Sequence, residues 1–268
     1  MNIVKMNLYR FFKMKAVYVF MLITTLLVAF IVVDGRATTP EEMQLYQEME
    51  EENGGNVGVA VGIVNSFNLD DITAEFISSS MLLVFIAIFM SIFFNKERSK
   101  GYLKNLSSCT NKRNYLFLSK LPVVVIFVLL LFVSVWIGAL LTCDKVITCT
   151  ISELVIYNVV ELIIHIAFGV FICMLNELCR SSISLVLGIV AAVAAPTAIL
   201  SGVMHLIPGL AKLSAICNFF TATLVPQVCL NGTIESAVAL PIIVGVAVIL
   251  AGIYAVIGLL SINKRDLF

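Results

Sequence analysis

The stretch NKERSKGYLKNLSSCTNKRNYLFLSK, residues 95–120, carries seven of the seventeen Lys and Arg residues in the chain. Apolar runs at 76–94 and 121–141 flank it on both sides. Each run is close to the length of about 20 residues that a helix needs to cross a bilayer. The sequence therefore predicts that 95–120 is the main loop on one side of a membrane, because charged residues are costly inside the hydrocarbon.

The composition of the whole chain also indicates an integral membrane protein. Of its 268 residues, 60% are apolar and 13% are charged, and the mean hydropathy is +1.06. A single soluble core could not bury that much apolar surface. The first apolar run has the length of a full span and no small-x-small site follows it, so we expect it to remain attached rather than to be a cleaved signal peptide.

Apolar runs separated by polar or interrupted segments predict an all-α fold with six transmembrane helices. We expect one transmembrane domain over 16–268, preceded by an amphipathic interfacial helix over 1–15. Leu8, Phe11 and Phe12 lie on one face of that helix, although a basic flank to the first span is the alternative interpretation. The predicted spans cover residues 16–33, 76–94, 121–141, 154–175, 183–207 and 237–261.

Two connecting segments have an unusual composition. Residues 34–75 are polar and acidic, with six Glu residues between 41 and 52. Residues 208–236 are too apolar for an ordinary loop, yet Pro208 and Pro226 interrupt them. Irregular backbone is tolerated at membrane depth only when it is buried in protein or faces a cavity. The second segment therefore predicts re-entrant or interfacial helices before the last span.

Basic residues are distributed unevenly between the two sides of this topology. Six spans put both termini on the same side as the 95–120 loop, and the other side has only Arg36, Lys145 and Lys212. The positive-inside rule then places both termini in the cytoplasm. Thirteen of the seventeen acidic residues fall on the external face, which should be markedly negative.

Missing motifs exclude several classes of activity. No Gly is followed by Lys, which rules out a Walker A loop, and no His-Glu-x-x-His or Gly-x-Ser elbow occurs. The seven Cys residues match no metal spacing; Cys143 with Cys149, and Cys217 with Cys229, either form external disulfides or stay unpaired. We therefore expect no catalytic site, metal or cofactor in this chain, and its juxtamembrane basic residues indicate lipid contact rather than a nucleic-acid partner.

The basic loop has the properties of a docking element. Leu103 and Leu106 form an apolar ridge, and Arg98, Lys100 and Lys104 can pair with acidic groups of a partner. A solvated basic loop without a partner is the alternative. The loop contains Glu97, then Gly101, Tyr102, Leu103, Lys104, Asn105 and Leu106, and finally Arg113, Tyr115, Ser119 and Lys120.

These residues resemble the acid, glycine, coupling helix and closing Arg and Lys of ABC-2 (type V) exporter permeases. The resemblance covers essentially the whole chain, and in size and loop the chain is also similar to small lantibiotic-immunity and antimicrobial-peptide permeases of bacteria. It implies a bacterial plasma-membrane subunit that pairs with a second, identical or homologous permease. It also implies separate cytoplasmic ATPase chains that bind ATP and Mg²⁺. The ATPase-coupling residues would be Glu97, Arg98, Gly101, Tyr102, Leu103, Lys104, Asn105 and Leu106.

Glu161 is the only acidic residue deep inside a predicted span, and His165 follows one helical turn later. A charge at that depth is costly unless it is paired or hydrated. The two side chains either contact a substrate or proton in the transport pathway or form a satisfied structural pair. Pro196 should kink the predicted span 183–207, which is a further candidate for the pathway.

The sequence thus predicts the permease subunit of an ATP-driven exporter, with a peptide or an amphipathic, lipid-like compound as its substrate. Two other functions stay open. The acidic segment 34–75 could capture an extracellular peptide that the protein senses without moving it. Alternatively, Glu161 and His165 could serve an ion-coupled secondary transporter.

Overall fold

The computed structural model of the chain describes residues 3–37, 68–99, 114–144, 147, 150–179, 181–193 and 240–264. Within these ranges the protein is helical throughout, apart from short connections and one isolated bridge between Asn68 and Asp144. The predicted all-α class is therefore confirmed. The helices are α1 (Ile3–Lys13), α2 (Lys15–Ala37), α4 (Leu69–Ser78), α5 (Ser80–Ser99), α7 (Asn114–Leu118), α8 (Leu121–Thr142), α9 (Ile151–Leu178), α10 (Ser181–Val193) and α14 (Leu240–Lys264).

Four helical segments are long and apolar enough to cross a membrane, and their mean hydropathies are 2.8, 3.0, 2.2 and 2.5 in chain order. They coincide with the first, third, fourth and sixth predicted spans, which supports a multi-pass membrane protein. A shorter apolar segment, Ser182–Ala192, begins where the fifth span was predicted. The four long segments are Lys15–Asp34, Asn114–Thr142, Ile151–Leu178 and Val244–Ile262.

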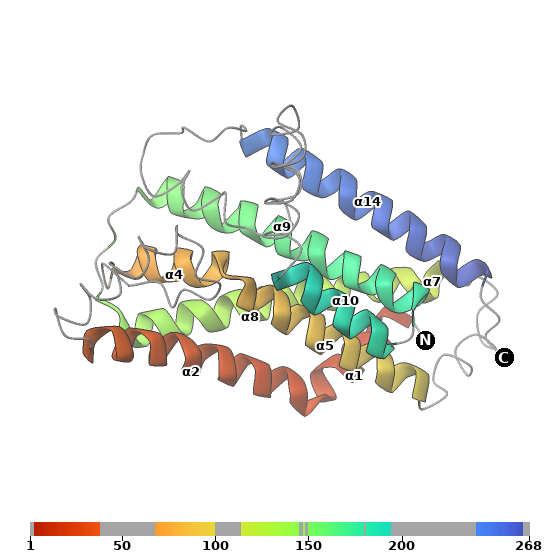
Figure 1. Cartoon of the computed structure of the whole chain (residues 1–268), viewed down its shortest axis with the longest axis horizontal. Coiled ribbons are helices and arrows are strands. Elements are labelled where there is room, and N and C mark those ends of the chain that lie inside the picture. The colour runs from red at the N-terminus through yellow and green to blue at the C-terminus, as the bar shows by residue number, and fades with distance from the viewer. Residues whose placement is uncertain are drawn as a thin grey trace.

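The long helices run side by side along the long axis of the molecule (Figure 1). Helix α14 packs on α9, α2 packs on α8, and α10 packs on α5. Helices α1 and α7 lie at one end of this bundle, where α5, α9 and α14 also finish (Figure 1). We call this end the terminal end, because the first described residue of α1 and the last of α14 both lie there.

The second predicted span differs from the structure in its boundaries. The sequence analysis placed one helix over 76–94, whereas α4 ends at Ser78 and α5 continues to Ser99. Ser79 has an extended backbone, and both its N–H and its Oγ bond to the Phe76 carbonyl oxygen, at 3.3 and 2.6 Å. A serine that bonds the preceding turn in this way competes with continuation of the helix. The apolar run alone gave no signal for this break.

The end of the 95–120 stretch is also not the water-exposed loop that its charge predicted. Leu116, Phe117, Ser119 and Lys120 are buried, and α7 packs against α14. Burial of Leu116 and Phe117 is favourable because it removes apolar surface from water. The burial of Lys120 depends on the ionic contacts described below.

Phenylalanine rings fix α1 and α2 against the bundle. The rings of Phe89 and Phe127 are stacked at a centroid distance of 3.9 Å, and Phe11 and Phe20 meet the Phe89 ring edge-on at 5.7 and 5.9 Å. Such edge-to-face and stacked contacts add to the burial of the rings. A helix is present within the predicted 1–15 segment as α1, with Phe11 fully buried in protein and Phe12 46% exposed, while its place at a membrane interface stays a prediction.

Candidate functional site

Glu97 lies near the end of α5, at the terminal end of the bundle, and its side chain is only 1% exposed. Arg10 of α1 donates from Nη1 to Glu97 Oε1 at 3.0 Å. The Arg10 guanidinium carbon also lies 5.2 Å from the centre of the Phe93 ring, within range of a cation–π contact. Glu97, assigned to ATPase coupling from the sequence, is therefore held inside the bundle.

Lys120 is the residue immediately before α8, and its side chain is 2% exposed. Its Nζ donates to Glu177 Oε1 at 2.5 Å, and Glu177 belongs to the last turn of α9. The same Nζ lies 3.1 Å from Glu97 Oε2, a close ion pair without hydrogen-bond alignment. The Phe94 ring centre, 4.4 Å from Nζ, provides a further cation–π contact.

Arg10, Glu97, Lys120 and Glu177 form what we call the charge network. Two carboxylates face two basic groups, so their formal charges cancel. Buried ion pairs are tolerated when each charge has a close partner, and removing one partner leaves an uncompensated charge. The network connects α1, α5, the start of α8 and the end of α9.

Neutral hydrogen bonds surround the charge network. Asn7 Nδ2 donates to Ser119 Oγ at 2.8 Å, and that hydroxyl donates to the Leu116 carbonyl at 2.9 Å. Ser261 of α14 donates to the backbone carbonyl of Glu177 at 3.2 Å. The side chains of Asn7 and Ser119 are buried, so these bonds satisfy polar groups that would otherwise be costly to bury. These hydrogen bonds also connect α7 and α14 to the helices that the charge network joins.

The charge network joins the two ends of the basic stretch, residues 95–120. Glu97 precedes residues 100–113 and Lys120 follows them, and the two side chains meet directly. A force applied to that segment reaches α5 and α8 through its two ends, and the ion pairs connect these helices to α1 and α9. Both ends of that segment are therefore connected to four helices of the bundle.

The other predicted coupling residues do not take part in the charge network as described. Arg98 belongs to the helical backbone of α5, while Gly101, Tyr102, Leu103, Lys104, Asn105 and Leu106 lie outside the described residues. Of the residues that carried the resemblance, Tyr115 is 54% exposed, Ser119 and Lys120 are buried, and Arg113 lies outside the description.

Sequence reasoning missed Arg10 and Glu177. Arg10 lies within the predicted interfacial helix over 1–15, and Glu177 lies between the predicted fourth and fifth spans, so neither stood out as a site residue. One signal was present: on the predicted cytoplasmic side the only acidic residues are Glu97, Glu177 and Asp266. Scarce acids on a basic side are candidates for specific ion pairs, but pairing them requires the tertiary structure.

Glu161 and His165 are both fully buried in α9. His165 Nδ1 lies 2.8 Å from the Glu161 carbonyl oxygen and 3.5 Å from Glu161 Oε2. Among the described residues, neither carboxylate oxygen of Glu161 nor Nε2 of His165 has a hydrogen-bond partner. The Phe132 ring covers the imidazole edge-on at 5.3 Å. The two residues do meet, as their spacing predicted, but the pair is not fully satisfied within the described part of the protein.

The third pathway candidate, Pro196, lies outside the described residues, as do Cys149, Cys217 and Cys229, whose pairing as disulfides was left open. In the described ranges, no group of three or more His, Cys, Asp or Glu side chains is arranged to hold a metal ion. In the part of the chain that the structure describes, the charge network and the Glu161–His165 pair bring together most of the buried ionisable side chains.

Comparison with known proteins adds no assignment: no family model matches the chain, and no curated protein matches it at a significant level.

Proposed function

We propose that this chain is the permease subunit of an ATP-driven exporter in a bacterial plasma membrane. It would pair with a second, identical or homologous permease and with separate cytoplasmic ATPase chains that hold ATP and Mg²⁺. The substrate class is a peptide or an amphipathic, lipid-like compound. The chain itself would have no ATPase site and would act as a transport pathway.

The proposal includes six spans and cytoplasmic termini. Four apolar segments of spanning length and the shorter Ser182–Ala192 support the helix count, and α4 with α5 would make the second span. The first turns of α1 and the end of α14 lie at the same end of the bundle as the charge network (Figure 1). The positive-inside rule favours the cytoplasm for the predicted side that holds segments 1–15, 95–120, 176–182 and 262–268, because these segments carry fourteen of the seventeen Lys and Arg residues.

The observation that carries the proposal is the ion pair between Glu97 and Lys120 at the base of the basic stretch. A loop that only anchors topology needs no buried connection between its two ends. Here the ends are joined to each other and, through Arg10 and Glu177, to two further helices. This is the connection expected if ATP-driven closure of a partner pushes residues 100–113 and moves several spans together.

The test is purification from native membranes in a mild detergent, followed by identification of bound proteins. A stoichiometric nucleotide-binding subunit should accompany the wild type and should be lost from Leu103→Asp, which puts a charge on the apolar ridge. Asn95→Asp adds the same charge at an exposed position of α5 and should keep the subunit. A wild type that carries no such subunit after cross-linking contradicts the proposal.

A second candidate is an ion-coupled transporter, favoured by the buried Glu161 carboxylate that lacks a hydrogen-bond partner among the described residues. Intramembrane acids commonly mark ion or proton pathways. This function predicts uptake of protons by proteoliposomes that contain the chain alone, and loss of that uptake in Glu161→Gln. If transport requires an ATPase and is unchanged in Glu161→Gln, the ion-coupled function is excluded and the exporter function remains.

A further inference from the structure

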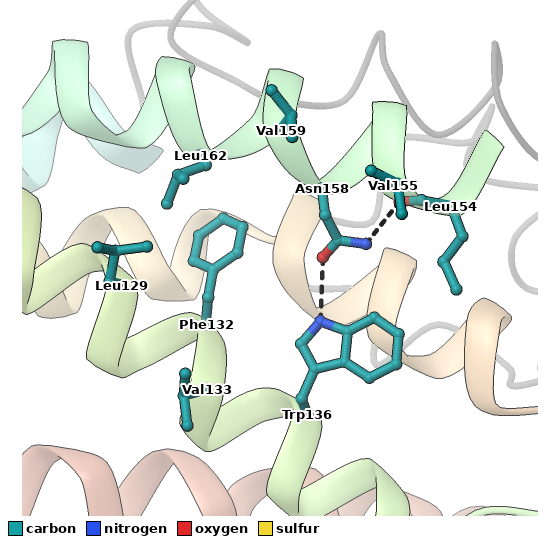
Figure 2. Close-up of a pocket in the computed structure, with 9 residues that line it drawn as sticks. All are labelled: Leu129, Phe132, Val133, Trp136, Leu154, Val155, Asn158, Val159 and Leu162. Carbon is teal, nitrogen blue, oxygen red and sulfur yellow. Dashed lines mark hydrogen bonds between the residues drawn. The ribbon is translucent and has the colours of Figure 1, made fainter. Parts of the chain in front are cut away.

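An apolar groove of about 360 Å³ lies between α8 and α9 (Figure 2), and none of the residues that line it belongs to the charge network. Its α8 side consists of Leu129, Phe132, Val133 and Trp136, which follow the three- and four-residue spacing of one helical face. Its α9 side has the same spacing. The volume falls within the range of about 300–1,000 Å³ that is typical of small-molecule sites.

The rim of the groove is exposed. Leu129 and Val133 are 42% and 48% exposed, and Val155 and Val159 on the opposite side are 55% and 49% exposed. Both helices are long and apolar enough to span the membrane, so a groove that opens between them opens into hydrocarbon. Its occupant therefore comes from the lipid phase.

Among the described residues that line the groove, the only polar side chains are Trp136 and Asn158, which are bonded to each other at one end. Trp136 Nε1 donates to Asn158 Oδ1 at 3.0 Å, and Asn158 Nδ2 donates to the Leu154 carbonyl at 2.8 Å. Figure 2 shows this pair at one end of the groove, with Leu129 and Leu162 at the other. The Trp indole N–H is already used, so the groove favours an apolar chain over a polar head group.

The direction of the occupant follows from the helix ends. Trp136 and Leu154 lie near the ends of α8 and α9 that approach the Thr142–Ile151 connection, while Leu129 and Leu162 lie deeper. Trp side chains are enriched at the membrane interface, with the apolar ring inward. A lipid would thus have its head group beyond Trp136 and its chain running toward Leu129.

We infer that the α8–α9 groove binds one acyl chain of a membrane phospholipid. The chain would pack against Phe132, which lines the groove and also covers His165. A bound lipid would hold this ring in place and exclude water from the Glu161–His165 pair. The inference depends on α8 and α9 spanning a membrane and not on the transport proposal, so the two can fail separately.

Trp136 is the single Trp of the chain and serves as an intrinsic reporter. The purified full-length protein in detergent micelles is titrated with phosphatidylcholine brominated on its acyl chains. We expect saturable quenching of Trp136 fluorescence, stronger with bromines near the head group than at the chain end. Val159→Phe fills the groove and should raise the half-quenching concentration about tenfold, equivalent to about 1.4 kcal/mol.

Two matched variants control for misfolding. Val256→Phe makes the same change at a 55% exposed position of α14 and should quench as the wild type does. Val159→Ala leaves the groove open and should also keep the quenching. Quenching that rises linearly with lipid and is equal in Val159→Phe and wild type overturns the inference. A Trp136 that brominated lipid does not quench, as expected if another part of the protein fills the groove, overturns it as well.

Discussion

Glu97 and Lys120 form a buried ion pair, with 3.1 Å between Oε2 and Nζ, although the most basic stretch of the chain separates them in sequence. The pair places the start and the end of that stretch side by side. Each residue has a second partner, Arg10 for Glu97 and Glu177 for Lys120. The base of the predicted loop is therefore part of the helical bundle.

Replacing Lys120 by Met should destabilise the protein by about 3–5 kcal/mol, because Glu97 and Glu177 would remain buried without their shared cation. The measurement is the free energy of unfolding of the purified protein, followed by Trp136 fluorescence during titration with a denaturing detergent. The control Lys96→Met removes a Lys from an exposed position of the same helix as Glu97. It should change the free energy of unfolding by less than about 1 kcal/mol. Equal losses in the two variants would contradict a special role for Lys120.

A double-mutant cycle isolates the contact between Glu97 and Lys120. Glu97→Gln, Lys120→Met and the double variant should give a coupling free energy of about 0.5–3 kcal/mol. Additive effects, with no coupling, would mean that the 3.1 Å contact contributes nothing of its own to stability.

Gly258 of α14 allows close approach to α7. A Cβ at this position would lie 2.5 Å from the ring of Phe117, which is fully buried. Gly258→Val should therefore cost about 1–3 kcal/mol through overpacking. At Gly252 the added Cβ of Ala meets no described atom within 4 Å beyond the adjacent part of its own helix. Gly252→Ala should therefore be neutral or should stabilise by up to about 1 kcal/mol, since Ala is the better helix former. The measurement is the thermal unfolding temperature of both variants in detergent. An unfolding temperature of Gly258→Val equal to that of the wild type would show that α7 and α14 separate easily.

Two buried acids should respond oppositely to the same substitution. Glu97→Leu removes a carboxylate that both Arg10 and Lys120 contact and should destabilise the protein by about 3–5 kcal/mol. Glu161→Leu removes a carboxylate without a hydrogen-bond partner among the described residues, so stability should be unchanged or higher. Parallel unfolding measurements compare them. A large loss in Glu161→Leu would identify that residue as part of a satisfied structural pair.

Patterns that depend on one helix could be predicted from the sequence. The bounds of the third span, 121–141, nearly match α8 (Leu121–Thr142), because an uninterrupted apolar run has one stable conformation in a bilayer. The spacing of Glu161 and His165 likewise predicted their contact, since residues four apart share a helical face. The break at Ser79 was missed because its cause is a side-chain hydrogen bond rather than a change in hydropathy.

The sequence by itself determined the all-helical class, the positions of the main apolar helices and the concentration of positive charge in residues 95–120. These properties follow from local hydropathy and from charge, which each segment carries regardless of its neighbours. Only the tertiary structure decided that Arg10, Glu97, Lys120 and Glu177 share one buried cluster, and that Trp136 and Asn158 line one groove. Such contacts join separate helices, and their geometry depends on how ridges of side chains pack against each other.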